Sequence, residues 1–195
     1  MKSEITEKHV NNFLFRLYFD LSKGYENAAI IRAYRDFNRT LKNFPKNETE
    51  KSLLKNKWNA ILTIKIQEIK SIQFANAEDF TKWHQKSCIE LQTANKEYLL
   101  TQGQTQKWIN MTLKYLSVMG ENYVPGISKN YEYFHIPIDN IIMRKFEKLG
   151  IKKFENVWSQ ISDYKTYYEY QVAVRNLFKK RIPLDVEFEL FNQLS

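Results

Sequence analysis

The chain has little of the residues that build cross-linked, metal-bound or disordered structures. One cysteine, Cys88, excludes a disulfide framework within the chain and a cysteine-rich zinc or iron–sulfur site. The three histidines (His9, His84 and His135) show no short metal-ligand spacing. Five glycines and four prolines provide no flexible linker. We therefore expect an ordered chain with no metal and no other cofactor.

Long apolar runs and a surplus of acidic residues are also missing. No stretch approaches the roughly 18 apolar residues of a membrane span, and the first residues lack the pattern of a secretory signal. These absences lead us to expect a cytoplasmic protein with no membrane partner. The net charge of +8 favours an anionic partner, with nucleic acid ahead of a membrane surface. A basic charge that only maintains solubility is the alternative.

Hydrophobic residues make up 43% of the chain, and their spacing is helical throughout. The expected fold is all-α, in a single domain over residues 1–195. We expect 1–76 and 151–195 to be helical lobe regions and 77–150 to carry the hairpin and the reactive groups. The pattern predicts helices over residues 10–21, 28–42, 47–69, 77–96, 105–119, 139–149, 157–161 and 164–178, with a final piece from 183.

The predicted helix after Gly103 is apolar over most of its circumference. Its exceptions are Lys107, Asn110, Lys114 and Ser117, which fall within a sector of about 80° at helical spacing. A nearly buried helix with one narrow polar stripe presents that stripe to a cleft or to solvent.

Lys107 is the candidate nucleophile on this stripe. We expect it in the first turn of its helix, where the helix dipole disfavours an ammonium and favours the free amine that attacks carbon. The alternative is a surface lysine whose stem covers apolar neighbours.

Asp139 is the candidate carboxylate partner. It follows Pro137-Ile138 and precedes an amphipathic run, so its most ordinary role is that of a helix N-cap. A capping carboxylate is also held rigidly and kept ionised, which suits it to stabilise a developing cation such as an oxocarbenium-like sugar.

Together, Gly103…Gln106-Lys107 and Pro137-Ile138-Asp139 resemble the helix-hairpin-helix DNA glycosylases, most closely the branch with the 8-oxoguanine glycosylase fold. The resemblance covers roughly residues 80–150, and Arg144 with Leu149-Gly150 continues it. The chain departs from the family in carrying one glycine where the usual hairpin is Leu-Pro-Gly-Val-Gly. The 32-residue spacing from Lys107 to Asp139 is also longer than in many members.

The resemblance implies two helical lobes around a cleft and a bifunctional glycosylase with β-lyase activity. Lys107 would attack the sugar C1′ of a flipped nucleotide, and Asp139 would support the positive charge. The residues expected to contact nucleic acid are Gly103, Gln104, Gln106 and Lys114, and those expected in the base pocket are His135 and Trp108. The partner would be double-stranded DNA with a damaged or modified base, bound by a nucleoid-associated monomer.

Two further groups of residues allow more than one interpretation. The tyrosines Tyr164, Tyr167, Tyr168 and Tyr170 with Trp158 could stack on an extruded base or belong to the core. Lysines near 145–153 and 179–181 could contact phosphates or be simply solvated.

Two other functions remain open from the sequence. One is a non-catalytic basic helical module that binds nucleic acid or protein, in phage defence for example. The other is a structural all-α protein with no nucleic-acid role.

Overall fold

The computed structural model describes residues 5–193; residues 1–4 and 194–195 of the predicted domain lie outside the described residues. The all-α fold class is confirmed, since the described part contains helices and no strand. The α-helices are α1 (Glu7–Tyr18), α2 (Tyr25–Phe37), α3 (Glu48–Ser71), α4 (Ala77–Thr93), α5 (Gln102–Met119), α6 (Asn140–Glu147), α7 (Tyr164–Leu177) and α8 (Pro183–Asn192). Three short 3-10 helices join them: η1 (Asn38–Thr40), η2 (Ile127–Tyr133) and η3 (Trp158–Gln160).

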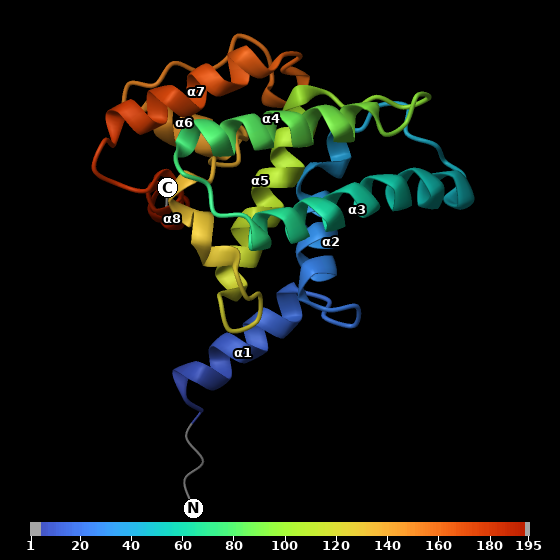
Figure 1. Ribbon diagram of the computed structural model, residues 1–195, viewed down its shortest axis with the longest axis horizontal. Coiled ribbons are helices and arrows are strands. Elements are labelled where there is room, and N and C mark those ends of the chain that lie inside the picture. The colour runs from blue at the N-terminus through green and yellow to red at the C-terminus, as the bar shows by residue number, and fades with distance from the viewer. Residues whose placement is uncertain (1–4, 194–195) are drawn as a thin grey trace, which may run out of the picture.

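Helix α5 is the central element of the fold. Every residue from Gln102 to Leu116 is buried, as the nearly all-apolar sequence of this segment predicts. Helix α2 packs along α5, and α4, η2, η3 and α7 pack against its other sides (Figure 1). The buried apolar side chains form one core, to which the regions 1–76, 77–150 and 151–195 all contribute.

Side-chain caps define where several helices begin. The side chain of Asn47 accepts hydrogen bonds from two amides at the start of α3, and Asp139 does the same for α6. The Asp139 cap confirms the prediction from the sequence. Asn76 and Asp163 cap α4 and α7 in the same way.

The start of α5 differs from the prediction of a helix beginning near residue 105. Thr101 and Gln104 form a capping box, in which each side chain bonds the backbone amide of the other, so α5 begins at Gln102. Lys107 therefore lies in the second turn and not in the first, and the dipole effect expected there is largely lost. The connection from α4 spans residues 94–101 and is not the tight turn that we expected.

Gly103 is required for a close approach between two backbone segments. A Cβ at this position would lie 2.0 Å from the carbonyl oxygen of Trp158 in η3. The backbone amide of Gly103 donates to the carbonyl of Ile161, at 3.0 Å. Because Gly103 has no side chain, η3 can lie directly against the start of α5.

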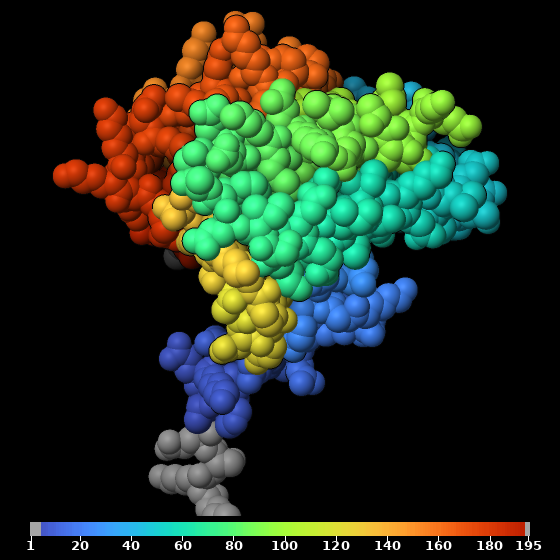
Figure 2. All heavy atoms as spheres, in the orientation of Figure 1, coloured from blue at the N-terminus to red at the C-terminus, as the bar shows by residue number. Residues whose placement is uncertain are grey.

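Helix α1 lies apart from the rest of the fold. None of its residues is buried, and it extends from the main body at the bottom of the view (Figures 1 and 2). Its last residue, Tyr18, returns to the body, because its hydroxyl lies 2.8 Å from the hydroxyl of Tyr115 in α5.

Over residues 5–193 no helix combines the length and the apolar character needed to cross a bilayer.

Candidate active site

The structure brings Lys107 and Asp139 into direct contact. Lys107 Nζ donates to Asp139 Oδ2 at 2.6 Å, across 32 residues of sequence. The other carboxylate oxygen, Oδ1, accepts from the amides of Ile141 and Ile142, both at 2.9 Å. One carboxylate therefore caps α6 and holds the amine of α5 at the same time.

The electrostatics of this contact keep Asp139 ionised. Burial alone would raise the pKa of the Asp139 carboxyl, but the nearby Lys107 charge and the amides of α6 outweigh it and lower that pKa below its ordinary value. At neutral pH the carboxylate is charged and is aimed at the amine. Such a group can stabilise positive charge without any proton transfer of its own.

The pair lies at a cleft of about 550 Å³ between α2, α5 and α8. The Lys107 side chain is only 4% exposed, and that of Asp139 is 24% exposed, so the carboxylate is the more open of the two. Three arginines from α2 and η1, namely Arg32, Arg35 and Arg39, line the same cleft. The arrangement combines an amine, an ionised acid and guanidinium groups that suit an anionic ligand.

A second amine–carboxylate pair lies in this cleft. Lys114 Nζ is 2.5 Å from Glu187 Oε2 in α8, and both side chains are almost fully buried. Burial lowers the pKa of Lys114 and raises the pKa of Glu187, although each partner's charge opposes that shift.

The predicted polar stripe of α5 is divided between two environments. Lys107 and Lys114 face the cleft, as expected for a stripe on its wall. Asn110 faces inward, where its side chain bonds His84, Gln106, Tyr167 and the carbonyl of Ile136.

The expected phosphate-gripping hairpin is wrong in its geometry. Gly103, Gln104 and Gln106 are buried, and the two glutamines are at most 5% exposed. The backbone amide of Gly103 donates to the Ile161 carbonyl, and that of Gln104 donates to Thr101 Oγ1 at 3.1 Å, so neither N–H is free to bind a phosphate. The Gln106 side chain bonds the backbone of Ile138, so it positions the segment before Asp139.

Lys114 and the two base-pocket residues also differ from their expected roles. Lys114 lines the cleft, but its ammonium is bonded to Glu187 and does not project toward solvent as a phosphate contact would. Trp108 is fully buried and donates to the carbonyl of Ile30. His135 is also buried and bonds the hydroxyl of Tyr167. Neither Trp108 nor His135 lines the cleft, so both are core residues.

Some residues of the cleft were not identified as site residues from the sequence. The arginines of the cleft had a visible signal, since Arg32, Arg35 and Arg39 recur at helical spacing. Glu187 and Phe188 had no local signal, because only the packing of α8 beside α5 brings them to the cleft.

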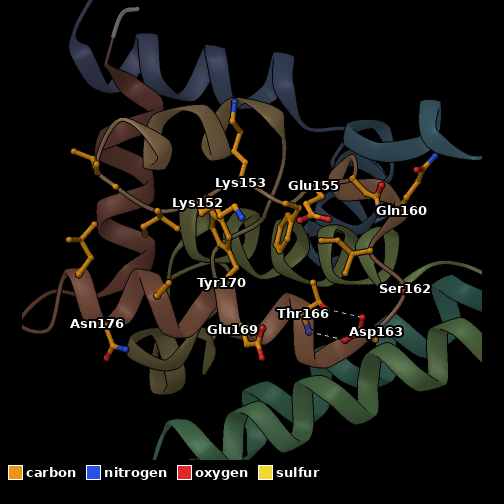
Figure 3. A pocket seen from close by; sticks show the side chains of 18 residues that line it. Lys152, Lys153, Glu155, Gln160, Ser162, Asp163, Thr166, Glu169, Tyr170 and Asn176 are labelled. Atoms are coloured by element: carbon orange, nitrogen blue, oxygen red, sulfur yellow. Dashed lines mark hydrogen bonds between the residues drawn. The ribbon is translucent and has the colours of Figure 1, made fainter.

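A larger hollow lies elsewhere in the described part of the chain. It measures about 790 Å³ and lies between α7 and the segment 149–163 (Figure 3). The bonds drawn there join Thr166 to Asp163 and form the cap of α7. We prefer the smaller cleft as the site, because it holds the amine–carboxylate pairs.

The tyrosines of α7 belong mainly to the interior. Tyr167 and Tyr170 are buried, and Tyr164 bonds the His84 imidazole at 2.9 Å. Their aromatic rings pack on the core and do not form a platform in the cleft.

Residues 5–193 contain no group of three or more histidine, cysteine or acidic side chains placed to hold a metal ion. No protein-family model matches the chain, and no curated protein or solved structure is significantly similar to it.

Proposed function

We propose that the protein is a DNA glycosylase with β-lyase activity, using Lys107 as nucleophile and Asp139 as its electrostatic partner. The observation that carries the proposal is the 2.6 Å contact between Lys107 Nζ and Asp139 Oδ2 at an arginine-lined cleft. The resemblance of these two segments to helix-hairpin-helix glycosylases supports the same assignment.

The Lys107 ammonium must lose a proton to react as a free amine, and that proton is the one that the departing base takes up. The lone pair of the amine forms a bond to the sugar C1′, and the electrons of the glycosidic bond leave with the base, which takes up a proton. The ionised Asp139 stabilises the positive charge that develops on the sugar. Ring opening gives a Schiff base between Lys107 and C1′. Loss of a C2′ proton then expels the 3′ phosphate, and water releases the lysine.

The substrate would bind as a flipped nucleotide in the cleft of about 550 Å³. Arg35 and Arg39 are exposed on the cleft lining and are suited to phosphate contacts. These arginines would make the phosphate contacts that the buried backbone amides of residues 103 and 104 cannot make.

Borohydride trapping on a duplex with one abasic site tests the proposal. The wild-type protein should form a covalent adduct that Lys107→Ala abolishes and Lys57→Ala, an exposed lysine of α3, retains. A parallel assay of base release from duplexes with modified bases detects a glycosylase that lacks the lyase step. The absence of both adduct and base release would refute the proposal, as would an adduct that persists in Lys107→Ala.

A second candidate is a non-catalytic nucleic-acid-binding module. It is favoured by the near-complete burial of Lys107, whose ammonium is already bonded to a carboxylate. Salt-dependent DNA binding with neither adduct nor base release would support this function instead.

A further inference from the structure

Helix α1 carries a stripe of exposed apolar side chains, which we call the α1 stripe. Val10, Phe13, Leu14 and Leu17 form it, and their spacing places them within an arc of about 100° on the helix. These four residues are between 43% and 68% exposed, and no residue of α1 is buried by the described chain. A helix of 12 residues is only marginally stable in water unless an amphipathic face is packed. We therefore expect the α1 stripe to be covered in solution.

The body of the protein lies on the other side of α1 and does not provide this cover. Phe15 lies roughly 150° around the helix from the middle of the stripe. Its ring stacks on that of Tyr123, with the ring centres 6.4 Å apart. The stripe thus faces away from the body, and α1 extends beyond the other helices (Figures 1 and 2). A partner can reach the stripe without breaking the contact of α1 with the body.

The charges of α1 favour a protein partner over a lipid or a nucleic acid. Lys8 and Arg16 stand against Glu7, and no charged residue lies between residues 10 and 15. A helix that lies on a membrane surface has a polar face rich in lysine and arginine. Nucleic-acid binding depends on the neutralisation of phosphates by such residues. Cores of protein–protein interfaces are instead depleted of charge and enriched in aromatic side chains, as the α1 stripe is.

We propose that α1 pairs antiparallel with α1 of a second copy of this chain and forms a twofold-symmetric dimer. The spacing of the stripe is symmetric about the midpoint between Phe13 and Leu14. An antiparallel partner therefore places Val10 opposite Leu17 and Phe13 opposite Leu14, twice each. The same arrangement keeps the two bodies, which follow the C-terminal ends of α1, at opposite ends of the pair. A dimer differs from the monomer expected from the sequence, and it does not depend on the glycosylase function.

A hollow beside the stripe provides a receiving surface for the partner. It measures about 570 Å³ and is lined by Asn11, Leu14, Phe15, Leu17, Tyr18, Phe19 and Val118. Phe13 is not part of this lining and is 62% exposed. In the antiparallel pair, Phe13 of each copy lies opposite Leu14 of the other and can enter the hollow there. Each copy thus supplies one exposed ring and one hollow, as an interface of identical patches requires.

The available surface determines how strong the pair is. At roughly 150–200 Å² for a whole large apolar side chain, the exposed fractions of the stripe, Ile5 and Tyr18 amount to about 600 Å² on each copy. Two copies would bury about 1,200 Å², which is the lower end of specific interfaces. We therefore expect a dimer with a Kd of about 1–100 μM that dissociates on dilution.

Sedimentation velocity of the full chain over about 1–300 μM tests the dimer, since this range spans the expected Kd. The mass of the wild type should rise from monomer to dimer across it. Leu14→Glu with Leu17→Glu places carboxylates against the partner's apolar side chains, so the Kd should increase about 100-fold or more. Both positions are exposed, so the fold should persist, as circular dichroism can verify. The matched control is Leu53→Glu with Ile64→Glu on exposed positions of α3, which should dimerise like the wild type.

Disulfide formation tests the antiparallel arrangement and does not need the glutamate variant to fold. The native Cys88 is buried, so wild-type protein should not cross-link. An oxidised mixture of the Val10→Cys and Leu17→Cys chains should yield a cross-linked dimer that contains one of each. Either chain alone should cross-link much less, because its two new thiols lie about 10 Å apart along the antiparallel pair.

Several results would overturn the proposal. A wild type that stays monomeric over the whole range excludes the dimer, and a dimer that persists in the folded Leu14→Glu/Leu17→Glu variant excludes α1 as its interface. Val10→Cys chains that cross-link to themselves as well as the mixture does would exclude the antiparallel arrangement. A monomer that floats with vesicles of phosphatidylcholine and phosphatidylserine would assign the stripe to a membrane surface instead. None of these measurements depends on base release or trapping, so the failure of one proposal is distinguishable from that of the other.

Discussion

The carboxylate of Asp139 caps helix α6 with one oxygen and binds the Lys107 ammonium with the other, at 2.6 Å. The cap fixes the acid in place, and the contact joins the start of α6 to the second turn of α5. A common structural device thereby holds the amine and the carboxylate in contact. The two functions of this one side chain can be separated by experiment.

Asp139→Asn should retain the cap and lose the charge. Asparagine caps helices about as well as aspartate, so α6 should stay folded. The loss of an electrostatic partner for the developing cation should lower base release about 100-fold or more. Because the buried Lys107 loses its counter-charge, the free energy of unfolding should also fall, by about 1–3 kcal/mol in denaturant titrations.

The same substitution at another cap is the control for that prediction. Asp163→Asn at the start of α7 removes a charge that has no lysine partner within ion-pair distance in the described chain. It should leave base release unchanged. Equal losses of activity in the two variants would argue against a specific role for Asp139.

Gly103→Ala should destabilise the fold even though alanine is the better helix former. The added Cβ would lie 2.0 Å from the Trp158 carbonyl oxygen, and a backbone atom cannot move aside cheaply. We expect the free energy of unfolding to fall by about 1–3 kcal/mol, measured by urea denaturation. Ser52→Ala, on an exposed position of α3, should change it by less than about 0.5 kcal/mol. An unchanged or increased stability of Gly103→Ala would contradict the close packing of η3 on α5.

Local patterns in the sequence were sufficient to indicate most of the helices and to single out Lys107 and Asp139, which the structure places in contact. Apolar spacing predicts the central burial of α5, and the position of Asp139 before an amphipathic run predicts its cap. The start of α5 was misplaced because the reciprocal bonds of Thr101 and Gln104 outweigh the break that Gly103 indicates. Residues from distant segments, such as Glu187, reach the cleft only through the packing of α8, so the local sequence does not identify them.

The buried imidazoles should make stability depend on pH. Burial lowers the pKa of His84 to about 3, from an ordinary value of 6.5, and lowers that of His135 as well. Below pH 6.5 the unfolded chain binds protons that the folded chain does not, so stability falls as the pH falls and keeps falling toward the folded-state pKa.

Comparison of the wild type with His84→Gln isolates the contribution of His84. Between pH 6 and pH 4 the free energy of unfolding of the wild type should fall more steeply, by about 1.4 kcal/mol per pH unit. Urea titrations across this range give the two slopes. If the free energies of unfolding of the two proteins changed in parallel with pH, His84 would take up its proton in the folded state as readily as in the unfolded chain.

Arg35 and Arg39 should account for part of the salt dependence of DNA binding. Both are exposed on the cleft lining, whereas Arg32 is already paired with Asp36 at 2.7 Å. If each contacts one phosphate, the double variant Arg35→Gln with Arg39→Gln should reduce the slope of log K against log salt by about 1.8. The measurement is a binding titration on a duplex with a tetrahydrofuran abasic-site analogue, at several salt concentrations.

A charge-matched control separates phosphate contact from a change in overall charge. Lys8→Gln with Lys86→Gln removes the same two charges from exposed positions of α1 and α4 outside the cleft. It should lower the affinity only slightly and leave the slope nearly unchanged, because counterions are released only where phosphate is neutralised. Equal effects of the two double variants would mean that DNA binding responds to the net charge of the protein, and that Arg35 and Arg39 do not contact the DNA backbone.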